Sequence, residues 1–313
     1  MPLHIETPLF QSRELSQLSG KTVWLKFEAL QPTGSFKLRG IGAACEAYRR
    51  QGKTRFVSSS GGNAGLAAAY AGRMLGVPVT VVIPRSTSAH MKTLLEQEGA
   101  TVIVHGEVWS EANQRAHDLL DAQTAFLHPF DDPLVWTGHA SLIDEVAGAG
   151  AAFDAVILSV GGGGLLSGIA EGLERNGLGR VPIIAAETEG ADCLAQAMSA
   201  GTNRSLPKIT SVATSLGANM VCDRAFDIAQ TRDVRSLVVS DLEALEACEG
   251  FLSDHRVLVE PACGAALAAL YSPRGRASLE GVERPLVVVC GGVTVTLEKI
   301  RAWKAAAERA DLS

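Results

Sequence analysis

Short runs of β-branched and other apolar residues alternate along the chain with longer stretches that have the spacing of helices. The short runs predict strands over residues 22–27, 55–57, 79–83, 101–104, 155–159, 182–186, 237–239 and 285–290. Helices are predicted between many of them, for example over residues 88–98, 109–123 and 241–253. Several strands are apolar on both faces, which is typical of parallel strands covered by helices on each side. The pattern therefore predicts an α/β fold built from β-α-β units.

The domain organisation follows less directly from the pattern. A chain of 313 residues is long enough for two domains, yet no Pro/Ser-rich linker separates two halves. We expect a smaller α/β domain, residues 31–135, to be inserted into a larger domain formed by residues 1–30 and 136–313. Residues 201–217 have little periodicity and are expected to be irregular.

Composition and charge exclude several classes of protein. Hydrophobic residues make up 47% and charged residues 20% of the chain, as in ordinary globular proteins. The net charge is −6 and no basic run is present, so nucleic acid is not an expected partner. The longest uncharged stretches are too short, and too broken by Gly and Ser, to span a membrane. The six cysteines are scattered and the N-terminus lacks the features of a signal peptide, so we expect a cytoplasmic protein with reduced thiols.

Glycine is the unusual part of the composition, with 32 residues in the chain. Clusters of glycine follow three predicted strands, at residues 58–65, 159–168 and 290–294. The carboxyl ends of parallel strands form the ligand crevice of an open α/β sheet, and glycine there lets main-chain N–H groups approach an anion closely. Four consecutive glycines, 161–164, are the best candidate for a phosphate cradle, with a flexible turn as the alternative.

Two familiar nucleotide motifs are absent from this glycine run. No Gly-Lys-Ser/Thr sequence follows it, so it is not a P-loop. The third glycine of the dinucleotide fingerprint is replaced by Leu166 or Ser167, depending on the register. The run therefore suits a small phosphate group better than a nucleotide.

A lysine between two glycine-containing turns adds a second element. Lys37 is flanked by Phe36 and Leu38, and although a lone lysine is usually a solvated surface charge, apolar neighbours favour desolvation. A desolvated lysine has a lowered pKa and forms Schiff bases. A phosphate cradle together with such a lysine suggests pyridoxal 5′-phosphate as cofactor.

These motifs resemble those of the fold-type II pyridoxal-phosphate enzymes, and among them the short L-serine/L-threonine dehydratases. The resemblance rests on six co-linear segments, residues 34–40, 59–65, 129–133, 161–164, 260–266 and 290–292. It covers essentially the whole chain. It implies two open, twisted, mostly parallel sheets flanked by helices.

The resemblance also implies roles for residues near Lys37 and in the first glycine cluster. Lys37 would carry the cofactor and remove the substrate's Cα proton, and Phe36 would pack against the pyridine ring. Asn63 would bind the cofactor's 3′-oxygen, with helix capping as the alternative. The substrate carboxylate would be bound by Ser59, Ser60, Gly61 and Asn63, and Ser60 would pass a proton to the leaving hydroxyl. Gly61 replaces an alanine common in the family, which suggests a looser pocket wall.

Further along the chain, the resemblance implies which residues contact the cofactor's phosphate and its ring nitrogen. Gly161, Gly162, Gly163 and Gly164 would surround the phosphate. Cys290 would face the pyridine nitrogen, with a small buried hydrophobic role as the alternative. A neutral thiol there makes a weaker electron sink than a carboxylate, which suits β-elimination. Residues 293–294, Val-Thr in place of the usual Ser-Asn, suggest altered contacts around the ring.

A monovalent cation, K⁺, is implied at a site built mostly from main-chain carbonyls. The matching positions are Gly161, Glu187, Ala191, Cys193, Leu216 and Ala218. Cys193 stands where a serine hydroxyl is common, and a thiol is a poorer ligand for this ion. His139, near the start of a predicted helix, is a further candidate for the pocket lining.

The predicted function is α,β-elimination by a pyridoxal-phosphate-dependent ammonia-lyase. L-serine would give pyruvate and ammonia, and L-threonine would give 2-oxobutanoate and ammonia. The alternatives are a serine racemase or a β-replacing enzyme on the same fold, and a non-catalytic protein that binds amino acids or the cofactor. The resemblance implies a homodimer.

Overall fold

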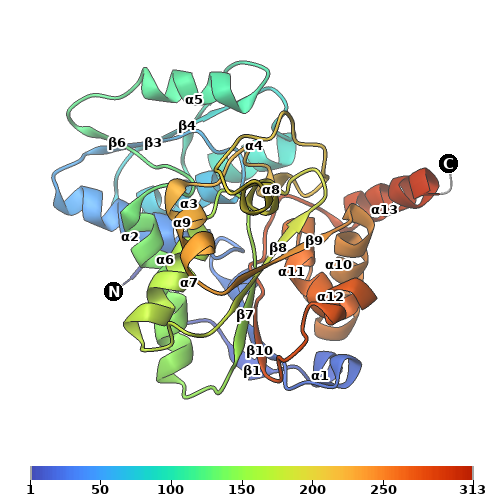
Figure 1. Ribbon diagram of the computed structural model, residues 1–313. Coiled ribbons are helices and arrows are strands. Elements are labelled where there is room, and N and C mark those ends of the chain that lie inside the picture. The colour runs from blue at the N-terminus through green and yellow to red at the C-terminus, as the bar shows by residue number, and fades with distance from the viewer. Residues whose placement is uncertain (1, 312–313) are drawn as a thin grey trace.

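The computed structural model describes residues 2–311, and its strands form two separate sheets (Figure 1). The larger sheet has six strands in the order β1-β2-β10-β7-β8-β9. All neighbouring strands are parallel except the edge pair β1 and β2, which is antiparallel. The strands are β1 (Leu9–Gln11), β2 (Trp24–Lys26), β7 (Ala155–Ser159), β8 (Ile183–Thr188), β9 (Val234–Val239) and β10 (Pro285–Val288).

The smaller sheet is formed entirely by a continuous segment in the middle of the chain. Its four strands are parallel and have the order β5-β4-β3-β6. They are β3 (Arg55–Ser58), β4 (Val79–Ile83), β5 (Thr101–Val104) and β6 (Thr124–Phe126). All four fall within the segment expected to form the smaller domain, while residues 1, 312 and 313 of the expected larger domain lie outside the described residues.

Helices connect and cover the strands of both sheets (Figure 1). The helices are α1 (Arg13–Ser19), α2 (Lys37–Arg50), α3 (Asn63–Leu75), α4 (Ala89–Gln97), α5 (Trp109–His117), α6 (Pro133–Gly148), α7 (Gly164–Arg175), α8 (Cys193–Ala200), α9 (Asp223–Thr231), α10 (Asp241–His255), α11 (Pro261–Tyr271), α12 (Pro273–Ala277) and α13 (Leu297–Asp311), with short 3₁₀ turns η1 (Glu28–Leu30) and η2 (Thr214–Leu216). No helix within residues 2–311 is long and apolar enough to cross a membrane.

The predicted α/β fold class is confirmed, and three predicted strands have the predicted bounds. These are β4, β5 and β7, and β4 and β7 are almost fully buried, as expected from strands that are apolar on both faces. The segment 201–217 is irregular apart from η2. The helix predicted over residues 109–123 ends earlier, at His117, and the chain then turns into β6, which the sequence pattern did not reveal.

Three helices pack unusually closely beneath the boundary between the two sheets. A side chain at Gly138 of α6 would come within 2.7 Å of the Cα of Gly40 in α2. A side chain at Gly168 of α7 would lie 2.4 Å from the Cβ of His139 in α6. Glycine at these positions therefore lets α2 and α7 approach α6 almost at main-chain distance, and this fixes the first residues of α2 relative to the larger sheet.

A buried group of four charges joins the two segments that pass between the sheets. The chain makes this passage through η1 and α2, and returns through α6. Arg39 of α2 is fully buried and makes paired hydrogen bonds to Glu28 (2.7 and 2.8 Å) and to Glu145 of α6 (2.6 and 2.7 Å). Lys26 of β2 also binds Glu145, at 2.5 Å. The two cations balance the two anions, so the group ties both passages to the larger sheet.

Candidate active site

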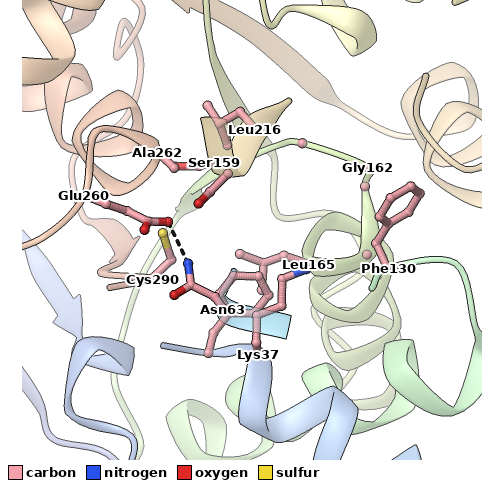
Figure 2. Close-up of a pocket in the computed structure, with 15 residues that line it drawn as sticks. Lys37, Asn63, Phe130, Ser159, Gly162, Leu165, Leu216, Glu260, Ala262 and Cys290 are labelled. Carbon is pink, nitrogen blue, oxygen red and sulfur yellow. Dashed lines mark hydrogen bonds between the residues drawn. The ribbon is translucent and has the colours of Figure 1, made fainter. Parts of the chain in front are cut away.

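A pocket lies where the glycine-rich segments after β3, β7 and β10 come together (Figure 2). It brings together eight residues predicted for cofactor binding, although they lie far apart in the sequence: Phe36, Lys37, Asn63, Gly161, Gly162, Gly163, Gly164 and Cys290. All three strands present their carboxyl ends to this pocket, as expected for a ligand site in a parallel α/β sheet.

Lys37 is the first residue of α2, and its side chain lines the pocket. The Nζ atom donates a hydrogen bond to the carbonyl oxygen of Pro129 at 2.6 Å and lies 5.2 Å from the centre of the Phe36 ring. Burial lowers the pKa of the Lys37 amine to about 8, against the opposing influence of Cys290 and Glu260. The amine is therefore neutral far more readily than that of a surface lysine.

The glycine run after β7 forms a cradle at the N-terminus of α7. Within residues 2–311, the main-chain N–H groups of Gly162, Gly163, Gly164 and Leu165 donate to no protein acceptor. A side chain at Gly162 would collide with the Phe130 ring at 2.3 Å, and Gly163 has a φ of 88° that favours glycine. Free N–H groups at a helix N-terminus favour an anion, so the cradle fits a phosphate group.

The loop between β3 and α3 carries the two serines that were expected to bind the substrate. Ser60 Oγ accepts a hydrogen bond from the N–H of Gly62 at 3.3 Å, so its own proton is free to be donated. Ser59 differs, because its buried hydroxyl donates to Oδ1 of Asn113 at 2.8 Å. Ser59, Ser60 and Gly61 are not part of the pocket lining that the structure outlines.

The space beside Gly61 is already filled. A methyl group at Gly61 would lie 2.6 Å from Oγ1 and 2.8 Å from Cγ2 of Thr87. The expectation of a looser wall at this position is therefore wrong, since Thr87 occupies the place that an alanine side chain would take.

Asn63 is held by two groups from the larger sheet's side of the pocket. Its Nδ2 donates to Oε1 of Glu260 at 2.8 Å (Figure 2), and its Oδ1 accepts from the N–H of Val293 at 3.1 Å. The N-cap of α3 is Gly62, with no side-chain cap. The capping alternative for Asn63 is therefore wrong, and its side chain belongs to the pocket.

Cys290 follows β10, and its thiol lines the pocket next to Glu260 (Figure 2). Hydrogen bonding to Cys263, together with burial, raises the pKa of the Cys290 thiol well above its ordinary value. The group is therefore a neutral thiol. The buried hydroxyl of Ser159 lies in the same pocket without a hydrogen-bond partner among the described residues.

Several pocket residues were not predicted as site residues. Phe130, Ser159, Leu165, Ser215, Glu260 and Ala262 all contribute to the lining. Phe130 and Glu260 belong to two of the segments that carry the family resemblance, and this was the only signal for them in the sequence. Glu260 is almost completely buried, and its contacts are formed with residues that are distant in sequence.

His139 does not line the pocket, contrary to its place as a candidate. It is fully buried behind Phe36, with the two rings 4.9 Å apart and tilted by 53°. Burial and the nearby Lys37 lower the pKa of His139 well below its ordinary value. A neutral imidazole in this position supports the Phe36 ring from behind.

Of the positions expected to bind a cation, Gly161 contacts both Cys193 and Leu216. The thiol of Cys193 donates to the carbonyl oxygen of Gly161 at 3.5 Å, and Gly161 also packs against Leu216. Glu187 is fully buried, and its two oxygens accept the N–H groups of Leu194 and Ala195 at 2.9 and 2.8 Å. Burial raises the pKa of Glu187 to about 8. Within residues 2–311, no cluster of three or more His, Cys, Asp or Glu side chains is arranged to hold a metal ion.

The two-sheet fold, the phosphate cradle and the desolvated lysine define a fold-type II pyridoxal-phosphate enzyme. Residues 1–291 match the family described as "Pyridoxal-phosphate dependent enzyme", and the chain belongs to this family.

Within this family, the chain is similar over nearly its whole length to proteins named for serine and threonine deamination. The human protein named "Serine dehydratase-like" is 49% identical over 311 residues, covering 97% of this chain and 94% of the relative. The human protein named "L-serine dehydratase/L-threonine deaminase" is 48% identical over 312 residues, covering 97% and 95%. Among solved structures, a fungal L-serine ammonia-lyase from Rhizomucor miehei has a TM-score of 0.92 and 32% identity, covering 97% of this chain and 99% of that structure.

Proposed function

We propose that this protein is a pyridoxal-phosphate-dependent ammonia-lyase that acts on L-serine and L-threonine. The observation that carries the proposal is the convergence of Lys37, whose amine pKa burial lowers to about 8, with the free main-chain N–H groups of residues 162–165 in one pocket. The full-length similarity to relatives named for serine and threonine deamination supports the same reaction. Serine would lose its Cα proton and its β-hydroxyl, and the resulting enamine would hydrolyse to pyruvate and ammonia.

The residues present fit the cofactor. The amine of Lys37 would hold it, the cradle of residues 161–164 would bind its phosphate, and Cys290 would face its ring nitrogen. Phe36 would support the ring, with His139 behind it. When bound, pyridoxal phosphate supplies an aldehyde for the substrate amine and an electron-withdrawing ring that stabilises charge at Cα.

The protein's own groups would move the two protons of the elimination. Lys37, once released by the substrate amine, would take the Cα proton, and its lowered pKa suits a base that works near neutral pH. Ser60 would donate a proton to the leaving hydroxyl, because its oxygen accepts from Gly62 and leaves its proton free. The substrate carboxylate would bind at the N-terminus of α3 through the segment of Ser59, Ser60, Gly61 and Asn63. Ser59 would contribute through its main chain, since its hydroxyl is bound to Asn113.

The test is formation of 2-oxoacid by the reconstituted enzyme. We expect pyruvate from L-serine and 2-oxobutanoate from L-threonine, and loss of both when Lys37 is replaced by alanine. Absence of a cofactor absorbance band in wild-type protein supplied with pyridoxal phosphate would overturn the proposal.

A serine racemase on the same fold is the alternative that one observation favours. A racemase needs a second acid/base on the opposite face of the substrate, and the free proton of Ser60 would meet that need. Chiral analysis of serine after incubation separates the two reactions, because a racemase gives D-serine and a lyase gives pyruvate.

Domain bounds, cellular location, oligomeric state and a cation site complete the proposal. We propose a larger domain, residues 1–30 and 136–313, a smaller domain, residues 31–135, a cytoplasmic location and a homodimer. We also propose that K⁺ binds near Glu187, because this buried carboxylate forms no ion pair among the described residues and a cation would offset the cost of ionising it. The remaining oxygen ligands would come from the carbonyls of residues 161, 191, 193, 216 and 218.

A further inference from the structure

Glu260 is a buried acidic residue at the N-terminus of α11. It is the N-cap residue of α11, and its side chain accepts no hydrogen bond from the N–H groups of that helix. The residue is only 3% exposed and forms no salt bridge within residues 2–311. Its carboxylate instead points into the pocket (Figure 2). Burying an acidic group without a cationic partner is costly, so its contacts there need an explanation.

The carboxylate of Glu260 is surrounded by hydrogen-bond donors. Oε1 accepts from Nδ2 of Asn63 at 2.8 Å, and Oε2 accepts from Oγ1 of Thr294 at 2.6 Å. Burial raises the pKa of Glu260, and the hydroxyls of Thr294 and Ser215 oppose that rise. A side chain at Gly292 would lie 2.0 Å from Cδ of Glu260, so the carboxyl group packs directly on that glycine. The carboxylate is therefore held in one place as an acceptor.

These contacts determine which way the amide of Asn63 faces. The N–H of Val293 can only donate, so it requires Oδ1 of Asn63 on its side. Oε1 of Glu260 is the acceptor on the other side, so it requires Nδ2 there. Turning the amide over would place donor against donor at the partly buried Val293 and acceptor against acceptor at the buried Glu260. Nδ2 carries two hydrogens, and one remains for a ligand in the pocket that Asn63 lines.

We propose that Glu260 is a positioning residue that holds the second N–H of Asn63 ready to bind an anionic oxygen on the ring of the bound cofactor. This inference rests on the proposed function, because it needs pyridoxal phosphate in the pocket. Asn63 begins α3, which follows β3 of the smaller sheet, whereas Glu260 precedes α11 and Thr294 follows β10 of the larger sheet. Glu260 therefore also keeps this donor in place across the boundary between the two sheets.

The experiment compares four variants after reconstitution with pyridoxal phosphate. The variants are Asn63→Ala, Glu260→Met, Glu260→Gln and the double variant Asn63→Ala/Glu260→Met, and the readouts are the dissociation constant of the cofactor and the absorption maximum of the bound form. We expect Asn63→Ala and Glu260→Met each to weaken binding about tenfold, as for one lost hydrogen bond, and to shift the absorption maximum alike. The double variant should be no weaker than Asn63→Ala, because Glu260 acts through Asn63. Glu260→Gln keeps an acceptor oxygen and should remain within about threefold of wild type.

Two further comparisons keep the test decisive. Glu243→Met is the matched control, since it removes a carboxylate that binds a main-chain N–H in α10 away from the pocket, and it should leave cofactor binding unchanged. If Glu260→Met does not fold, Thr294→Val tests the same carboxylate by removing one of its donors, and Thr294→Ser should restore the wild-type spectrum. A Glu260→Met or Thr294→Val enzyme that matches wild type in affinity and spectrum would overturn the inference, as would effects that multiply in the double variant. Unchanged binding in Asn63→Ala would instead overturn the proposed cofactor site itself, and the role of Glu260 with it.

Discussion

Replacing Arg39 with methionine should destabilise the protein strongly, because Arg39 is the central cation of the buried charge group. The substitution keeps much of the side-chain volume but removes four short hydrogen bonds, two to Glu28 and two to Glu145. Glu145 retains Lys26, whereas Glu28, which is fully buried, loses the one ion pair that it forms among residues 2–311. Breaking a buried pair in this way costs about 3–5 kcal/mol.

The size of this effect can be converted into a melting temperature. With an unfolding entropy of about 2.1 cal/mol/K per residue, a chain of 313 residues has about 0.65 kcal/mol/K in total. The loss of about 3–5 kcal/mol therefore lowers Tm by about 5–8 °C. Thermal unfolding followed by circular dichroism measures this shift.

A matched control uses an ion pair that water can reach. Arg175 and Asp144 form a pair in which both side chains are 42% exposed, so Arg175→Met should cost less than about 1 kcal/mol. Adding Glu28→Gln to Arg39→Met should recover part of the lost stability, since it removes the unpaired buried charge. If Arg39→Met lowers Tm no more than Arg175→Met does, the reasoning about the buried group is refuted.

Three other predictions concern the pocket and the cation site. The rate at which apoenzyme binds pyridoxal phosphate, followed by stopped-flow absorbance, should rise with pH through about 8. Burial lowers the pKa of Lys37 to about 8, and only the neutral amine reacts. A rise centred near pH 10.5 would contradict this. Gly163→Ala should weaken cofactor binding at least tenfold in a titration, since its methyl would lie 2.3 Å from Ala225 Cβ. Gly177→Ala is the control, because Gly177 also has positive φ but has open space around it. Burial raises the pKa of Glu187 from its ordinary 4.5 to about 8, so the folded protein loses stability as the pH rises between these values. Because K⁺ would favour the ionised carboxylate, K⁺ should raise Tm more at pH 8 than at pH 6. An equal effect of K⁺ in Glu187→Gln would contradict this.

Much of the fold was predictable because the information is local. Strands β4 and β7 are apolar on both faces, so their bounds follow from the run of apolar residues in the sequence. Strand β1 is a three-residue edge strand with two exposed positions, and β6 is equally short, so neither has a pattern long enough to detect. These strands are specified by their pairing partners in the sheet rather than by their own residues.

The site was predictable where one segment of chain carries the chemistry. The four glycines after β7 were the best candidate for a phosphate cradle, with a flexible turn as the alternative, and the apolar neighbours of Lys37 favoured a desolvated amine over a surface charge. Glu260 could not be assigned in this way, because its role depends on Asn63, which lies 197 residues away. Thr87 beside Gly61 was missed for the same reason, since only tertiary packing places it there.

The most direct test of the central claim is a 2-oxoacid assay on the reconstituted enzyme with L-serine and L-threonine, using wild type and Lys37→Ala side by side. Wild type should form pyruvate and 2-oxobutanoate with equal amounts of ammonia. Lys37→Ala should fold but form neither product above background. A wild-type enzyme that binds pyridoxal phosphate yet releases no 2-oxoacid, or a Lys37→Ala variant as active as wild type, would contradict it.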